Sequence, residues 1–133
     1  MNDFATSIWP RLHSLLSKFA ILVNGHVPNL KHDLSCTEND HFLLRAYLSF
    51  LKSPAGDELA ITIDAQVIDG KLSMSSDLCF EGGLILATGP AAKFSLAKDK
   101  AESARQVDEW LDKFETFLND IEDRALAVAA NLS

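Results

Sequence analysis

The residues of this sequence that could bind a metal are four histidines and two cysteines. The histidines stand at positions 13, 26, 32 and 41, outside any H-E-x-x-H or H-x-H pattern. Cys36 and Cys79 are far apart and belong to no C-x-x-C pair. Because zinc sites draw their ligands from short, fixed spacings, the sequence predicts no metal site. We expect two reduced and mostly buried thiols, as is usual in a cytosolic protein.

Covalent catalysis and cofactor binding also leave recognisable patterns. A serine nucleophile needs a base and an oxyanion site, and no G-x-S-x-G segment is present. The pair Gly82-Gly83 lacks the Lys-Ser/Thr of a phosphate-binding P-loop. The sequence therefore predicts no cofactor, no catalytic residue and a protein that is not an enzyme.

The one pair of carboxylates with a definable geometry depends on a β-hairpin. Asp69-Gly70 separates two alternating runs over residues 58–80, and both turn residues readily adopt positive φ. In such a hairpin, opposed residue numbers sum to 139. Nine of the ten residues on one face are then apolar, the exception being Ser76. Asp64 and Asp77 fall on the other face, about 7–8 Å apart on the diagonal.

This second hairpin face is polar, and its acids are more typical of a solvated surface than of a catalytic pair. Antiparallel sheets commonly leave one face in water. If the helices cover the apolar face, a flat polar face stays open to a protein partner. The residues predicted to bind that partner are Thr62, Asp64, Gln66, Ser73, Ser75 and Asp77.

The elements around the hairpin follow from apolar periodicity. A stripe over residues 8–23 predicts a helix with Ser7 as N-cap, Pro10 in its first turn and Asn24-Gly25 as its stop. Alternation over residues 29–37 and 42–52 predicts two strands. After a turn at 81–83 we expect short strands over 84–87 and 93–97.

From about Lys100 a heptad stripe continues to Leu132. It predicts one helix of about 30 residues, roughly 45 Å long. Its last turns could extend past the sheet, and there they could pack on the first helix, fray or meet a partner. The stripe beyond Ile121 could then pair two copies as a homodimer. The predicted fold is one α+β domain over residues 1–133. An antiparallel meander of about four to six strands has the N-terminal helix and the long C-terminal helix packed on one face.

The formal charge of −7 is concentrated in two regions. Residues 33–81 hold nine acids and three bases, and residues 99–124 hold nine acids and four bases. An acidic surface disfavours nucleic acid and anionic membranes and favours a basic protein partner. No apolar run is long enough to span a bilayer, and the N-terminus lacks a secretory pattern, so we expect a cytoplasmic protein.

The segment over residues 76–90, followed by V-x-x-W-L-x-x-F-x-x-F-L from Val107, resembles small bacterial immunity proteins of contact-dependent inhibition and polymorphic-toxin systems. This resemblance covers the last 60 residues. It implies stoichiometric neutralisation of a cognate toxin by occlusion, without chemistry in the protein itself.

Two other hypotheses remain open. An acidic secretion chaperone of the class I type III kind has similar size and terminal helices, but its pattern places a helix among the strands. A small ligand-binding protein or enzyme, with a pocket between sheet and helices, is the third.

Overall fold

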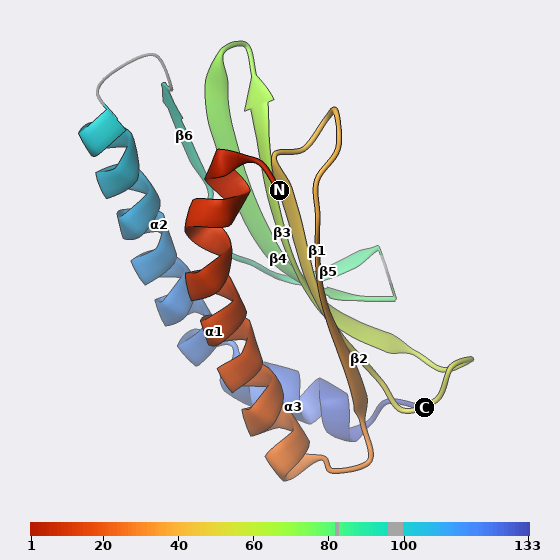
Figure 1. The fold of residues 1–133 in the computed structure, drawn as a ribbon. Helices are drawn as coiled ribbons and strands as arrows, with labels where there is room; N and C mark the ends of the chain where they lie inside the picture. Colours follow the sequence, from red (N-terminus) through yellow and green to blue (C-terminus); the bar gives the residue numbers. More distant parts are fainter. Residues whose placement is uncertain (82, 96–99) are drawn as a thin grey trace.

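A computed structural model describes residues 1–81, 83–95 and 100–133. It contains one antiparallel sheet with helices on one side of it (Figure 1). The helices are α1 (Asp3–His26), α2 (Lys100–Asp120) and α3 (Glu122–Ala130). The strands are β1 (Lys31–Thr37), β2 (Leu44–Leu51), β3 (Glu58–Ile68), β4 (Lys71–Phe80), β5 (Leu84–Thr88) and β6 (Ala92–Ser95). The predicted α+β meander is confirmed.

The strands follow one another in the order β1-β2-β3-β4-β5, and β6 also pairs with β4. β5 pairs with the Asp77–Phe80 end of β4, whereas β6 pairs with the Lys71–Met74 end. The last two strands thus share one edge of β4. The predicted strand over 93–97 is found at Ala92–Ser95, and its last two residues, like Gly82 in the preceding turn, lie outside the described residues.

The hairpin has the predicted register. Leu59 lies opposite Phe80 and Val67 opposite Leu72, and Asp69 and Gly70 have φ of 53° and 75°. Nearly all side chains on the helix-facing side are buried, from Leu59, Ile61, Ile63 and Ala65 on β3 to Leu72, Met74, Ser76 and Leu78 on β4. The apolar residues whose alternation predicted the core face are therefore the residues that pack toward the helices.

The first helix is longer than predicted at both ends. Asn2, not Ser7, is the N-cap, and its side-chain oxygen accepts a hydrogen bond of 2.8 Å from the backbone N–H of Ala5. Pro10 consequently lies inside the helix, on its exposed side, where water can reach the carbonyl group left without a donor. Gly25 does not stop the helix, which continues to His26.

The C-terminal heptad stripe forms two helices instead of one. The chain bends at Ile121, which has φ −89° and ψ −2°, and α3 then turns under the sheet (Figure 1). Ile121, Ala125, Ala129 and Leu132 are all buried. The helix does not extend past the sheet, because the bend returns these apolar residues to the core, where α3 contacts α1, in line with the alternative that the last turns pack on the first helix.

Candidate interaction surface on the open sheet face

The helices cover one side of the sheet, and no described helix covers the other (Figure 1). We call this other side the open face. Its residues are the outward-facing positions of β1 to β4: Lys31, Asp33, Ser35, Thr37, Arg45, Tyr47, Ser49, Leu51, Glu58, Ala60, Thr62, Asp64, Gln66, Ile68, Lys71, Ser73, Ser75, Asp77 and Cys79. All six residues predicted to bind a partner lie on it, and the hairpin register alone places them there.

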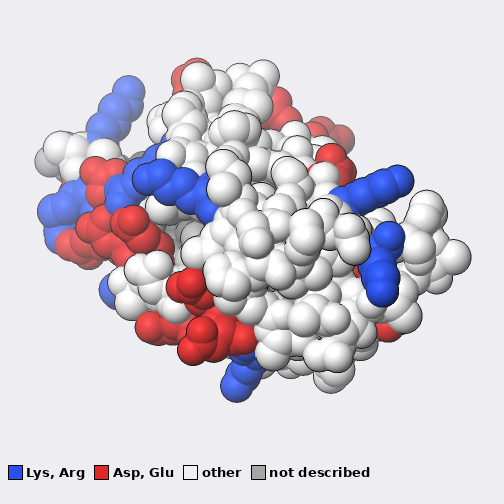
Figure 2. All heavy atoms as spheres, turned by 90° about the horizontal axis from the view of Figure 1, so that it is seen from below, with Lys and Arg blue, Asp and Glu red and all other residues white. Residues whose placement is uncertain are grey.

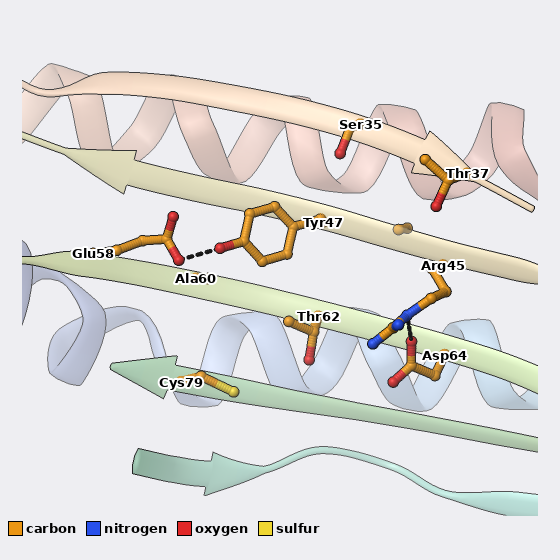
Figure 3. Close-up of a pocket in the computed structure, with 10 residues that line it drawn as sticks. Ser35, Thr37, Arg45, Tyr47, Glu58, Ala60, Thr62, Asp64 and Cys79 are labelled. Atoms are coloured by element: carbon orange, nitrogen blue, oxygen red, sulfur yellow. Dashed lines mark hydrogen bonds and ion pairs between the residues drawn. The ribbon is translucent and has the colours of Figure 1, made fainter. Parts of the chain in front are cut away.

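A hollow of about 450 Å³ lies on the open face. It is lined by ten residues of β1 to β4: Ser35, Thr37, Arg45, Ala46, Tyr47, Glu58, Ala60, Thr62, Asp64 and Cys79. Figure 3 shows how these side chains lie along β3, with Glu58 toward one end, Asp64 toward the other and Thr62 between them. The hollow contains Thr62 and Asp64 from the predicted set, whereas Gln66, Ser73 and Ser75 lie nearer the hairpin turn.

Three lining residues carry polar chemistry that the sequence reasoning missed: Arg45, Tyr47 and Glu58. The apolar alternation of residues 44–50 does put Arg45 and Tyr47 on one face of their strand. The register between that strand and the next could not be predicted from the sequence, because six residues connect the two strands instead of a two-residue turn. In the structure Arg45 lies opposite Asp64, and Tyr47 opposite Thr62.

Two side-chain contacts organise the hollow. Arg45 Nε donates to Asp64 Oδ1 at 2.9 Å, and its guanidinium also lies 4.3 Å from the centre of the Phe42 ring. The Tyr47 hydroxyl donates to Glu58 Oε1. Figure 3 marks both polar contacts. Burial of the phenol and its contact with the Glu58 carboxylate both raise the pKa of Tyr47, so the phenol stays the proton donor.

Asp77 borders the hollow on β4, directly opposite Thr62. Partial burial and the nearby charge of Asp64 raise the pKa of Asp77. Partial burial likewise raises the pKa of the Cys79 thiol, with Asp77 and Asp64 adding to the effect. A thiol with a raised pKa is a poor nucleophile at neutral pH, which argues against a reactive cysteine here.

The acids of α2 are arranged differently from those of the open face. Arg105 pairs with Glu102 and Glu109 on the same helix, and Arg11 of α1 pairs with Asp112. Figure 2 shows Asp and Glu side chains interleaved with Lys and Arg on the side where α2 lies. Among the residues that the structure describes, no Lys or Arg forms an ion pair with Glu58 or Asp77.

The other chemical candidates are not brought together. His13 and His26 lie on the exposed side of α1, His32 contacts Asn24 and Phe50, and His41 is in a loop. Within the described ranges, no group of three or more His, Cys, Asp or Glu residues could hold a metal ion. Both cysteines are partly buried and free.

A second hollow of about 280 Å³ lies between α1, α2 and the sheet. Phe4, Ile8, Leu72, Phe94, Val107 and Leu111 make its lining mostly apolar. Asp108 is its one titratable residue. Its other polar lining residues are Ser7 and Ser103. The Ser7 hydroxyl donates to the Phe4 carbonyl, and Asp108 pairs with Arg11.

The comparisons with known proteins give no match: no family model, curated protein or solved structure resembles this chain significantly. Among the described helices, none combines the length and the apolar character needed to cross a membrane.

Proposed function

We propose that this protein is a non-enzymatic binding module that holds a basic partner protein on its open face. The observation that carries this proposal is the pair of acids at the hollow along β3. Glu58 lines the hollow and Asp77 lies beside it on β4, and neither forms an ion pair with a Lys or Arg among the described residues. A basic side chain from another protein would complement both charges. Catalysis is the weaker alternative, because the Cys79 thiol beside these acids has a raised pKa and the described residues include no group that could hold a metal ion.

The cost of ionising Asp77 supports the same proposal. An acid whose pKa is raised in the folded state destabilises that state when the acid is charged. The stability of the fold therefore gives no reason for a charged Asp at position 77. Residues of this kind are more typical of a functional surface than of a structural one. A bound cation would remove that cost.

The particular kind of module that we favour is an immunity protein that neutralises a cognate toxin by stoichiometric binding. The resemblance of residues 76–90 and of the helix from Val107 supports it. A class I type III secretion chaperone is the alternative, and the strand order favours the first reading, because β1 to β6 follow one another without a helix in the described segments 31–81 and 83–95.

The test is co-expression with the protein encoded by the neighbouring open reading frame, followed by affinity pull-down. We expect a stoichiometric complex, and loss of this protein should sensitise the cell to the neighbouring gene product. A neighbouring secretion effector that depends on this protein for export would support the chaperone instead. If the neighbouring product is not bound and cells lacking this protein are no more sensitive, the immunity proposal fails.

A further inference from the structure

The open-face hollow has a direction and a length. Glu58, Ala60, Thr62 and Asp64 are alternate residues of β3, so they lie in a row along the strand. At about 3.3 Å per residue, the distance from Glu58 to Asp64 is about 20 Å. The hollow is therefore a trough parallel to β3, with Tyr47 and Arg45 on one side and Cys79 on the other (Figure 3).

The charges along this trough are not equivalent. Asp64 is neutralised by Arg45, whose guanidinium is also held over the Phe42 ring. Glu58 accepts a hydrogen bond from the Tyr47 hydroxyl, which carries no charge to complement the carboxylate. Asp77 lies opposite Thr62, beside the middle of the trough. Two acids without a basic partner among the described residues are thus separated by the four residues from Glu58 to Thr62, about 13 Å along the strand.

The geometry points to a partner that presents two cationic side chains about 13 Å apart, one for Glu58 and one for Asp77. This inference rests on the proposed function and adds the charge spacing of the partner. In an extended segment laid along β3, such side chains stand at positions i and i+4, on the same side of the segment. Arg45 already occupies the Asp64 end, so a third cation there is repelled.

A short synthetic peptide with capped ends provides the probe. It carries arginine at positions i and i+4 in a serine and threonine background, and its control has the same composition with the two arginines adjacent. Amide chemical shifts of the ¹⁵N-labelled protein are followed during titration at low ionic strength, where charge contacts are least screened. We expect the i, i+4 peptide to bind more tightly, with shifts centred on Tyr47, Glu58, Thr62 and Asp77.

Neutral variants test the two acids separately. Glu58→Gln and Asp77→Asn should each weaken binding about two- to fivefold, as expected for exposed charge pairs. Their effects should multiply, because sites more than about 10 Å apart act independently. Arg45→Gln should tighten binding by freeing Asp64. Glu115→Gln on α2, an exposed acid away from the trough, is the matched control and should change nothing.

The inference is overturned if the peptide with adjacent arginines binds equally well, if neither peptide binds, or if the shifts lie outside the trough. It is also overturned if Glu58→Gln and Asp77→Asn leave the affinity unchanged. If one of these results is found while reversal of the open-face charges still disrupts a protein complex, the spacing is wrong and the proposed function stands. If the peptides bind as expected but the neighbouring gene product does not, the immunity proposal alone fails.

Discussion

Ser76 of β4 and Trp110 of α2 donate hydrogen bonds to the same acceptor, the carbonyl oxygen of Pro90, at 3.1 and 3.0 Å. Ser76 is the polar exception on the core face of the hairpin, and it is buried. The backbone N–H of Gly89 donates to the Ser76 carbonyl at 2.8 Å. The segment that connects β5 and β6 is thus hydrogen-bonded both to β4 of the sheet and to α2.

This shared acceptor predicts non-additive effects of mutation. In Ser76→Ala or Trp110→Phe alone, the Pro90 carbonyl keeps one donor, whereas the double variant leaves it with neither. We expect Ser76→Ala to cost about 1 kcal/mol of unfolding free energy, and the double variant to exceed the sum of the single costs by about 1 kcal/mol. Chemical denaturation of the four proteins measures this coupling, and strictly additive costs would show that the two donors act separately.

Gly89 is predicted to tolerate no side chain. A Cβ atom there would collide with Ser76 Oγ and lie 2.9 Å from Phe117 Cε2. We expect Gly89→Ala to lower the free energy of unfolding by about 1–3 kcal/mol, as overpacking does. The control is Gly25→Ala, where α1 leaves open space, and it should stabilise the protein by about 0.5–1 kcal/mol. Thermal melts compare the two, and equal effects would contradict the close approach at Gly89.

The N-cap of α1 gives a third prediction. Besides capping Ala5, the Asn2 side chain donates to Glu38 Oε2 at 2.7 Å and to the Leu43 carbonyl at 2.8 Å. Asn2→Ala should therefore cost about 1–2 kcal/mol. Ser7, whose hydroxyl donates to the Phe4 carbonyl within the helix, should change stability by less than about 0.5 kcal/mol when replaced by alanine. A larger loss of unfolding free energy for Ser7→Ala than for Asn2→Ala would indicate that Ser7 is the N-cap.

Asp77 gives a pH-dependent prediction. Its raised pKa means that the folded protein binds this proton more tightly than the unfolded chain does. Ionisation of Asp77 therefore lowers stability as the pH rises from the ordinary Asp range through the raised pKa. Asp77→Asn should raise the Tm at neutral pH, by an amount worth no more than about 0.5 kcal/mol. The gain should vanish below about pH 3.5, where an ordinary Asp is also protonated. Thermal melts of the unmodified protein and of Asp77→Asn from about pH 3 to neutral pH test this prediction. A lower Tm for Asp77→Asn at neutral pH would contradict it.

The hairpin shows why part of this fold could be predicted from sequence. Its two-residue turn, Asp69-Gly70, determines the register, so the positions of Asp64 and Asp77 on one face followed directly. The connection between β2 and β3 has no such turn. The alternation within each strand shows which face Arg45 and Tyr47 lie on. It does not predict that Arg45 contacts Asp64 or that Tyr47 contacts Glu58.

The helix ends could not be predicted because tertiary contacts decide them. Asn2 becomes the N-cap while its amide group reaches Glu38 and Leu43, which are distant in sequence. No Pro or Gly marks the bend at Ile121 in the sequence. The bend allows Ala125, Ala129 and Leu132 to be buried against the rest of the fold. The heptad spacing identified most of the buried positions, but Val107 and Val128 are only partly buried and Ala129, outside the heptad stripe, is buried. The spacing did not determine the path of the helix.

The central claim, that the open face binds a basic protein, is tested most directly by the affinity of the purified partner for two charge-reversed variants. Asp64→Lys/Asp77→Lys changes the open face, and Glu115→Lys/Asp120→Lys changes exposed acids of α2 by the same charge. We predict that the open-face variant binds at least about tenfold more weakly, a loss of about 1.4 kcal/mol, at a temperature where its thermal melt shows that it is still fully folded. The α2 variant should bind almost as the unmodified protein does. Full affinity in the open-face variant, together with weakened binding in the α2 variant, would contradict the account.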